Sequence, residues 1–481
     1  MIADLKPYAE YKPSSQAWLG DIPQHWSVLP NRALFGEVKD RDHPDEEMLS
    51  VTITRGIVRQ KALLEGSSKK DSSNLDKSAY KLVQPRDIAY NKMRAWQGAI
   101  GASGLRGIIS PAYVVMRLRR DDDLPSYFHH LYRTPQFAKE AERWSYGITS
   151  DMWSLRPEHF KMIYTPKPPP AEQVAIVRFL DWATGRLERA IRAKRKVIAL
   201  LNEQKQAIIH RAVTSGLNPS VPLKPSGIPW LGDIPQHWEV TRLYRVTDPA
   251  RKIMYGIVLP GPDVDRGVYI VKGGNCEEGR LRPEFLSRTT VEIESGYARS
   301  RLRGSDIVYA IRGSIGAAQI VPDELAGANV TQDAARIAPG PGIHPQWLLF
   351  AVRSRSFFNK LEAGAVGATI RGINIRDLKR TDLVVPPSEE QEQIATYLLE
   401  ETAQVNAAIS RLEREIELLH EYRTRLVADV VTGKFDVREV AARLQEEPAE
   451  PEVLGVIDAA AADERDTADE AEKAMTADSG D

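Results

Sequence analysis

The sequence has 481 residues, of which 42% are hydrophobic and 27% charged, a balance typical of globular rather than disordered or fibrous proteins. No apolar run approaches the roughly 20 residues of a membrane-spanning helix. The single cysteine, Cys276, excludes an intramolecular disulfide and a cysteine-based metal cluster. With no basic-then-apolar signal pattern at the N-terminus, we expect a cytoplasmic protein without membrane association.

The net charge of −1 is the sum of unlike parts. Residues 445–481 contain 13 acidic and two basic residues, a net charge of −11, so residues 1–444 carry +10. The acidic segment has no aromatic residue and cannot bury enough apolar surface to offset the entropy lost on ordering. We therefore predict a disordered acidic tail over residues 441–481 behind a basic body.

A nine-residue segment near the N-terminus, Trp18–Trp26, recurs without change as Trp230–Trp238. Both copies read Trp-Leu-Gly-Asp-Ile-Pro-Gln-His-Trp, which is too short and too proline-broken for a helix. Because large paired aromatic side chains usually belong to a core, we predict an ordered lead-in whose tryptophans anchor against the following domain. Stacking of these tryptophans on bases is the less favoured interpretation.

Two segments of similar size, about 21–165 and 233–385, each carry a net charge of +4. Short β-branched runs bounded by Gly, Pro and Asp favour strands in both segments. Each contains Asp-Ile-x-Tyr followed by Ile-Gly-Ala, and we treat these motifs as equivalent. They lie at Asp87–Tyr90 and Ile100–Ala102, and at Asp306–Tyr309 and Ile315–Ala317. We predict two compact α/β domains.

Long segments without internal proline follow the related entries Pro168–Gln173 and Pro386–Gln391. In both, mainly apolar residues recur at alternating three- and four-residue steps over five heptads, from 177 to 212 and from 395 to 430. The first helix carries a net charge of +5 over residues 171–217 and the second −6 over 388–433. Unlike charges favour mutual pairing, so we predict an intramolecular coiled coil rather than homodimerisation or two separately packed amphipathic helices.

These patterns predict a mixed α/β (α+β) fold with a pseudo-two-fold internal repeat. The expected parts are a lead-in with a first recognition domain, a spacer helix, a repeated lead-in with a second recognition domain, a second spacer helix and the acidic tail. Their boundaries are 1–165, 166–220, 221–385, 386–440 and 441–481.

Familiar catalytic motifs are absent. The sequence has no G-x-x-x-x-G-K-[ST] loop, no H-E-x-x-H pair, no G-x-S-x-G elbow and no Asn-Pro-Pro-aromatic run of the kind found in amino-methyltransferases. His129 and His130 are adjacent, a poor spacing for metal ligands, and Asp121–Asp123 is more typical of a solvated turn. We expect a chain that binds rather than catalyses, with no cofactor or metal of its own.

A basic body, two similar domains and a stiff spacer suit double-stranded DNA, because phosphates attract the basic surface while side chains read base edges. For any single basic residue, a solvated or ion-paired role is at least as common as base contact. The candidate DNA-binding residues are Lys69, Lys70, Tyr90, Asn91, Lys92, Arg94 and Trp96 in the first domain, and Lys272, Asn275, Arg301, Tyr309, Arg312 and Arg371 in the second.

The order of these motifs resembles the specificity (S) subunit of type I DNA restriction–modification systems, over about residues 5–440. The duplicated lead-in, the Asp-Ile-x-Tyr segments and the paired Pro-Pro…Glu-Gln helix entries carry the resemblance. It implies two target-recognition domains that each read half of a split, asymmetric DNA site. Antiparallel helices between them would set the length of the unspecified gap.

The resemblance also implies partners. Two methyltransferase (M) subunits would bring S-adenosylmethionine, and restriction (R) subunits would bring ATP- and Mg-dependent translocation and cleavage. The catalytic motifs missing from this chain would then belong to those partners.

Other functions stay open on the residues alone. The same architecture suits a stand-alone bipartite DNA-binding regulator or phage-exclusion factor, and a coiled-coil assembly protein would need no nucleic acid. A single-chain restriction–methylation enzyme conflicts with the missing motifs.

Overall fold

The computed structural model of the protein describes residues 5–64, 76–147, 153–228, 231–362 and 372–444. The candidates Lys69, Lys70 and Arg371 lie outside the described residues, as does the predicted tail from residue 445 onward. Residues 441–444, which the prediction assigned to the tail, are described: Ala441 is buried within helix α12 (Arg438–Arg443), and Leu444 is buried directly after it. No helix within the described ranges is long and apolar enough to cross a membrane.

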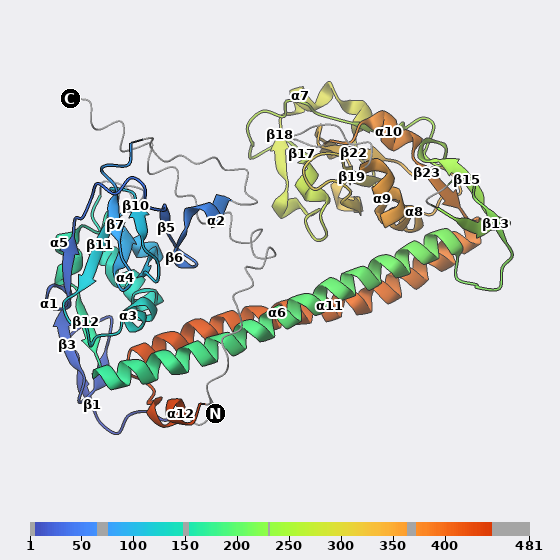
Figure 1. The fold of residues 1–481 in the computed structure, drawn as a ribbon. Helices are drawn as coiled ribbons and strands as arrows, with labels where there is room; N and C mark the ends of the chain where they lie inside the picture. The colour runs from blue at the N-terminus through green and yellow to red at the C-terminus, as the bar shows by residue number, and fades with distance from the viewer. Residues whose placement is uncertain (1–4, 65–75, 148–152, 229–230, 363–371, 445–481) are drawn as a thin grey trace. The chain divides into compact units, whose positions relative to one another are not determined.

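The chain divides into two compact units, each built from strands and helices (Figure 1). Unit 1 comprises residues 1–192 and 415–481, and unit 2 comprises residues 193–414. Two long helices, α6 (Pro170–Ser215) and α11 (Ser388–Val431), each contribute one part to both units. The expected mixture of helices and strands, with a long helix in each predicted spacer segment, is confirmed.

In unit 1 the strands are β1 (Tyr11–Pro13), β2 (Asp21–Pro23), β3 (Ser27–Pro30), β4 (Phe35–Val38), β5 (Leu49–Thr52), β6 (Gly56–Arg59), β7 (Lys81–Val83), β8 (Ile88–Asn91), β9 (Ile100–Ala102), β10 (Gly107–Ile109), β11 (Tyr113–Leu118) and β12 (Tyr164–Lys167). Its shorter helices, besides α12, are α1 (Asn31–Leu34), α2 (Gln60–Leu64), α3 (Pro125–Tyr132), α4 (Pro135–Arg143) and α5 (Pro157–Met162).

In unit 2 the strands are β13 (Leu223–Pro225), β14 (Asp233–Pro235), β15 (Glu239–Arg242), β16 (Met254–Tyr255), β17 (Val268–Val271), β18 (Ser287–Thr289), β19 (Ile307–Ala310), β20 (Ala318–Ile320), β21 (Asn329–Val330), β22 (Ala334–Ile337) and β23 (Asp382–Val385). Its shorter helices are α7 (Val291–Ser295), α8 (Pro345–Arg353), α9 (Arg355–Glu362) and α10 (Ile375–Arg380).

Each unit contains an antiparallel four-stranded sheet, and the strands occur in corresponding order. The orders are β4-β11-β8-β9 in unit 1 and β16-β22-β19-β20 in unit 2. The Asp-Ile-x-Tyr segments form the corresponding strands β8 and β19, each flanked by a neighbour on both sides. The units differ elsewhere, since the three-stranded sheet β18-β17-β21 belongs to unit 2 and the pairs β5-β6 and β7-β10 belong to unit 1.

The aspartate of each Asp-Ile-x-Tyr segment is a buried ion-pair partner. Asp87 accepts hydrogen bonds from Arg117 at 2.7 and 2.8 Å, and Asp306 accepts two from Arg251 at 2.6 Å each. The residue before each aspartate has a positive φ, 79° in unit 1 and 68° in unit 2. The motif therefore fixes the start of a central strand in both sheets.

The Ile-Gly-Ala segments are not equivalent, which corrects the sequence-based alignment. Ile100–Ala102 forms strand β9, and Ile100 pairs with Tyr90. In unit 2 the residue that pairs with Tyr309 is Ala318, so Ile315–Ala317 lies in the turn before β20. The Ile-Gly-Ala residues lie at different strand registers because the turn between β8 and β9 and the turn between β19 and β20 differ in length.

The long helices run antiparallel to one another within each unit. In unit 1 the beginning of α6 shares a core with the end of α11, and Arg423 contacts Glu188 at 3.1 Å. In unit 2 the end of α6 shares a core with the beginning of α11, and Lys205 donates to Asn406 at 2.6 Å. None of the predicted seam positions is exposed on either helix.

Each lead-in is clamped to the start of a long helix by a carboxylate. In unit 1 the Trp26 indole N–H donates to Glu172 at 3.0 Å, and the His25 ring lies 2.7 Å from the same carboxylate. In unit 2 the Trp238 indole donates to Glu390 at 3.0 Å, with the adjacent histidine ring at 2.6 Å. Trp26 and Trp238 are fully buried, which confirms the predicted anchoring role for these two. Trp18 is partly buried against Phe137, and Trp230 lies outside the described residues.

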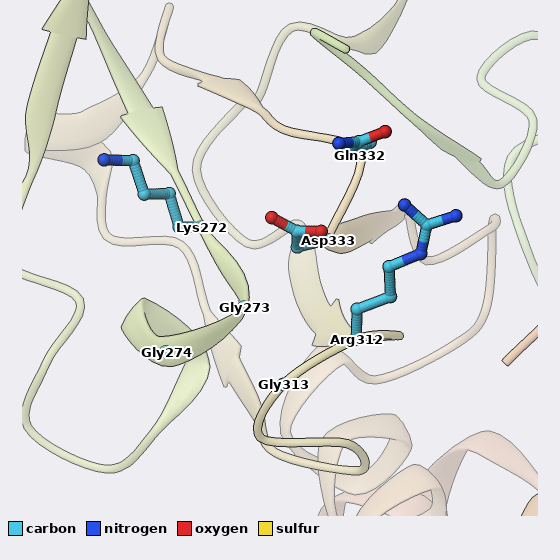
Figure 2. Close-up of a pocket in the computed structure, with 7 residues that line it drawn as sticks. All are labelled: Lys272, Gly273, Gly274, Arg312, Gly313, Gln332 and Asp333. Atoms are coloured by element: carbon cyan, nitrogen blue, oxygen red, sulfur yellow. The ribbon is translucent and has the colours of Figure 1, made fainter. Parts of the chain in front are cut away.

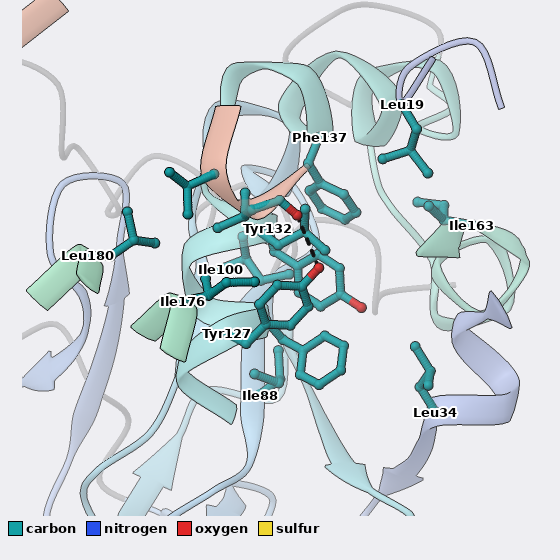
Figure 3. Packing of buried hydrophobic residues seen from close by; sticks show 14 of the residues in the cluster. Leu19, Leu34, Ile88, Ile100, Tyr127, Tyr132, Phe137, Ile163, Ile176 and Leu180 are labelled. Carbon is teal, nitrogen blue, oxygen red and sulfur yellow. Dashed lines mark hydrogen bonds between the residues drawn. The ribbon is translucent and has the colours of Figure 1, made fainter. Parts of the chain in front are cut away.

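The core of unit 1 joins the lead-in, the domain and both long helices. Its apolar cluster contains Trp26 from the lead-in, Tyr127 from α3, Ile176 from α6 and Val431 from α11. Figure 3 shows part of this cluster, with Ile176 and other buried residues gathered around Tyr127. The Tyr127 hydroxyl also donates to the Val431 carbonyl at 3.1 Å. The strands and short helices of unit 1 are therefore fixed to the parts of α6 and α11 that belong to this unit.

A buried histidine should make unit 1 sensitive to acid. Burial, together with the nearby charge of Arg133, lowers the pKa of His129 to about 3, and its Nδ1 accepts from the Ala102 N–H at 3.2 Å. In the unfolded chain the histidine pKa is about 6.5, so between pH 6.5 and pH 3 the unfolded chain binds a proton at this histidine and the folded unit does not. This contribution to stability is therefore complete above pH 6.5 and lost progressively as the pH falls toward 3.

We expect His129→Asn to lower the urea midpoint of unfolding at pH 7.5 but to reduce the further loss between pH 7.5 and pH 5. Urea unfolding of the full chain at both pH values measures this. If the urea midpoint falls equally between pH 7.5 and pH 5 in the variant and in the wild-type protein, His129 is not the source of the acid sensitivity.

Candidate nucleic-acid interface

The two central strands of each four-stranded sheet are antiparallel, so the end of the first lies beside the start of the second. The loops that leave the first strand and enter the second therefore meet at one end of the sheet. In unit 2, Ala310 at the end of β19 pairs with Ala334 at the start of β22. In unit 1, Asn91 at the end of β8 pairs with Tyr113 at the start of β11. Because the sheets correspond strand for strand, these are the same edge in the two units. We call it the reading edge.

In unit 2 a cleft of about 630 Å³ opens at the reading edge (Figure 2). It is lined by Lys272, Gly273, Gly274, Arg312, Gly313, Gln332 and Asp333. A Cβ atom on Gly273 would lie 2.4 Å from the Arg312 carbonyl oxygen, so only glycine fits at that position. The bare backbone of three glycines lets a ligand approach the cleft closely.

The backbone of the cleft is firmly held. The N–H groups of Ile311 and Arg312 donate to the Asp333 carbonyl at 2.9 and 3.2 Å, and the Gln332 N–H donates to Ile257 at 2.9 Å. The Lys272 ammonium donates to Ser287 at 3.0 Å. The cleft therefore presents its side chains from a fixed frame, as recognition of a specific ligand requires.

In unit 1 basic residues gather at the reading edge. Lys39 directly follows β4 and Lys92 directly follows β8, both next to β11. Buried Lys81 donates to the Pro111 carbonyl at 3.0 Å. Burial, then the charges of Lys92 and Arg41, lower the pKa of Lys81 to about 8. The shift comes mainly from burial of Lys81, and the neighbouring positive charges add to it.

The prediction that Tyr90 and Tyr309 contact DNA was wrong. Both rings are fully buried in the cores of their units, and burial raises the pKa of Tyr309 well above its usual value. Each tyrosine lies two residues after the isoleucine of its motif, and alternate residues of a strand face the same side. The tyrosines therefore pack with the core instead of facing a ligand.

Three other candidates have structural roles in the folded chain. The Asn91 side chain accepts from the Met93 N–H at 2.9 Å, and Asn275 accepts from the Lys272 N–H at 2.9 Å. Arg301 forms two hydrogen bonds, at 2.7 and 2.5 Å, with a buried glutamate of α7. These contacts hold in place the loops that carry the three side chains.

The remaining described candidates lie near the reading edges. Lys272 and Arg312 are exposed in the cleft of unit 2, and Lys92 and Arg94 are partly exposed after β8 in unit 1. Trp96 donates to the Met93 carbonyl at 2.8 Å, which fixes its ring beside the same loop. Contact of these residues with DNA stays a prediction.

Sequence reasoning missed several residues at these edges. Gln332 and Asp333 belong to no sequence motif. The one signal that could have indicated them is their position directly before strand β22. Lys39 and Arg41 alternate with aspartates, a pattern we would assign to a solvated surface, and Lys81 gave no signal of its burial.

Comparison with known proteins bears directly on this architecture. Residues 277–418, which include much of unit 2 and four of the seven residues that line its cleft, match the family model described as the type I restriction modification DNA specificity domain. The type I restriction enzyme EcoBI specificity subunit of Escherichia coli is 26% identical over 305 residues, covering 59% of this chain and 64% of that subunit. These comparisons show that the chain is similar to type I specificity subunits.

Other specificity subunits extend the similarity. The MjaVIII specificity subunit of Methanocaldococcus jannaschii is 25% identical over 368 residues, which cover 74% of this chain and 81% of that relative. A chain solved in work on complex assembly and conformational transition of a type I R-M system shares the fold, with a TM-score of 0.60 at 18% identity. That match covers 86% of this chain and 99% of the solved one.

Proposed function

We propose that this chain is the non-catalytic DNA-recognition subunit of a type I restriction–modification complex. Each unit would read one half of a bipartite, asymmetric site, and the antiparallel helices would set the gap between the halves. The observation that carries the proposal is the shared reading edge, where basic residues follow corresponding strands. Lys92 follows β8 and Arg312 lies just after β19.

The chemistry of the two edges supports two different half-sites. Lysine attracts phosphate as a point charge, whereas arginine forms two parallel hydrogen bonds with guanine. The unit 1 edge is rich in lysine, and the unit 2 edge combines Lys272 and Arg312 with an amide and a carboxylate. Two related but unlike readers suit an asymmetric site.

The partners follow from the proposed role. Two methyltransferase subunits would dock on this chain and supply S-adenosylmethionine-dependent methylation, and restriction subunits would add ATP- and Mg-dependent cleavage in the cytoplasm. The internal repeat would give the assembly a pseudo-two-fold scaffold. The acidic segment beyond residue 444, proposed as disordered, has no assigned task in this scheme.

The proposal is tested by removing one charge at each edge. We expect Lys92→Ala and Arg312→Ala each to weaken binding at one half-site only, Arg312→Ala by about 1–3 kcal/mol. Loss of a phosphate contact at Lys92 should also reduce the salt slope of binding by about one. Binding of the full chain, with and without a type I methyltransferase subunit, to duplexes selected from a random pool measures both effects.

Exposed basic residues away from the edges provide matched controls. Lys139→Ala on α4 and Arg266→Ala before β17 should leave the half-sites unchanged. The proposal fails if the wild-type chain selects no split sequence, or if it forms no complex with the methyltransferase subunit.

A further inference from the structure

The cleft of unit 2 contains an aspartate, Asp333, among its basic side chains. An acidic side chain is unexpected on a surface proposed to bind DNA. Asp333 precedes β22 and lines the cleft together with Lys272 and Arg312. In Figure 2 its carboxylate lies between the segments that carry these two basic residues. A carboxylate repels phosphate, so a contact with the backbone of DNA would cost affinity here.

The Asp333 carboxylate has no structural task within the described part of the chain. Its backbone carbonyl accepts two N–H groups and its own N–H donates to the Thr331 hydroxyl at 3.4 Å, but its side chain takes no part in these bonds. By contrast, the carboxylates of Asp87 and Asp306, which precede β8 and β19 at the other end of each sheet, are engaged by arginines. Asp333 is instead held by its backbone and left with free acceptor oxygens.

The base edges that DNA displays limit what such a group can recognise. A carboxylate only accepts hydrogen bonds, and the major-groove donors are the amino groups of cytosine N4 and adenine N6. Adenine places its N7 acceptor beside the amino group, which opposes a carboxylate, whereas cytosine offers its donor without that neighbour. Cytosine is therefore the better match.

Arg312 supplies the complementary half of this recognition. The backbone N–H of Arg312 donates to the backbone carbonyl of Asp333 at 3.2 Å. The Arg312 side chain, a donor, and the Asp333 side chain, an acceptor, are therefore attached to backbone segments that are held next to each other. A G·C pair presents the guanine acceptors O6 and N7 next to the cytosine N4 donor. An arginine and a carboxylate side by side match that pattern.

We infer that Asp333 is a specificity-determining residue, which accepts a hydrogen bond from cytosine N4 in the half-site of unit 2 while Arg312 binds guanine. This inference rests on the proposed function and names bases within one half-site. It makes the cleft a reader of at least one G·C pair.

The test is selection of duplexes from a random pool by the full chain and by Asp333→Asn. The wild-type chain should select a required cytosine in one half-site. The variant should lose that requirement by about ten-fold, because an amide both donates and accepts and prefers adenine. The other half-site should be unchanged, and continued selection of the remaining bases in the half-site of unit 2 shows that unit 2 of the variant is folded.

Asp265→Asn, at an exposed aspartate of unit 2 outside the cleft, is the matched control and should select the wild-type sequence. An unchanged cytosine requirement in Asp333→Asn, or no required cytosine in the wild-type half-site, would overturn the inference while leaving split-site binding intact. Failure of the wild-type chain to select any split site would overturn the proposed function itself.

Discussion

Deleting residues 198–204 of α6 together with 407–413 of α11 is expected to abolish recognition of the original DNA site and to shift preference to a shorter gap. The contacts Glu188–Arg423 and Lys205–Asn406 are 17 residues apart on both helices. Removing one heptad from each helix therefore keeps both contacts in register. The helices shorten by about 10 Å at 1.5 Å per residue, which corresponds to about three base pairs.

The measurement is selection from a random duplex pool, or mapping of methylated bases when a methyltransferase subunit is present. The matched control deletes 198–204 alone, which leaves the partner helix one heptad too long and should destabilise the helix pair. Selection of the original gap by the double deletion would rule out the spacer as the ruler.

Replacing Trp26 with alanine should destabilise unit 1 by about 3–5 kcal/mol, the range for removing a large buried aromatic side chain. The indole is fully buried and donates to Glu172, which is only 4% exposed. The variant therefore leaves a cavity and also removes a donor from a buried carboxylate. Trp238→Ala should cost less, by about 1 kcal/mol or more, because the side chain of Glu390 is 34% exposed and can be hydrated.

Hydrogen exchange of the full chain separates these effects, because peptides from each unit report on that unit alone. Trp26→Phe is the conservative control, since it restores most of the volume but not the N–H donor. Equal loss of protection in the Trp26→Ala and Trp238→Ala variants would contradict the role assigned to the buried carboxylate.

The lead-ins and the long helices could be predicted from the sequence because their signals are local. An exact nine-residue repeat and an apolar period near 3.5 residues need no knowledge of distant contacts. The choice of Tyr90 and Tyr309 failed because residue type was weighed without the two-residue alternation of a strand. With that alternation, the isoleucine of each motif would have placed its tyrosine in the core.

The reading edges were harder to predict because they join residues that are far apart in the chain. Lys272, Arg312 and Asp333 meet in one cleft only through strand pairing. The Ile-Gly-Ala alignment failed for a related reason, since identical letters occupied different registers on β9 and before β20. Local motifs therefore located the domains, while pairing between strands determined which side chains share a surface.

The division of the chain also has a consequence for its synthesis. Unit 2 is continuous, whereas unit 1 needs core residues such as Leu426 and Val430 from near the other end of the chain. At about 5–20 residues per second, translation from residue 192 to the start of the missing helix segment at 415 takes roughly 11 to 45 seconds. During that interval the nascent first half exposes an apolar surface, so unit 2 can close first and the N-terminal half completes its core last.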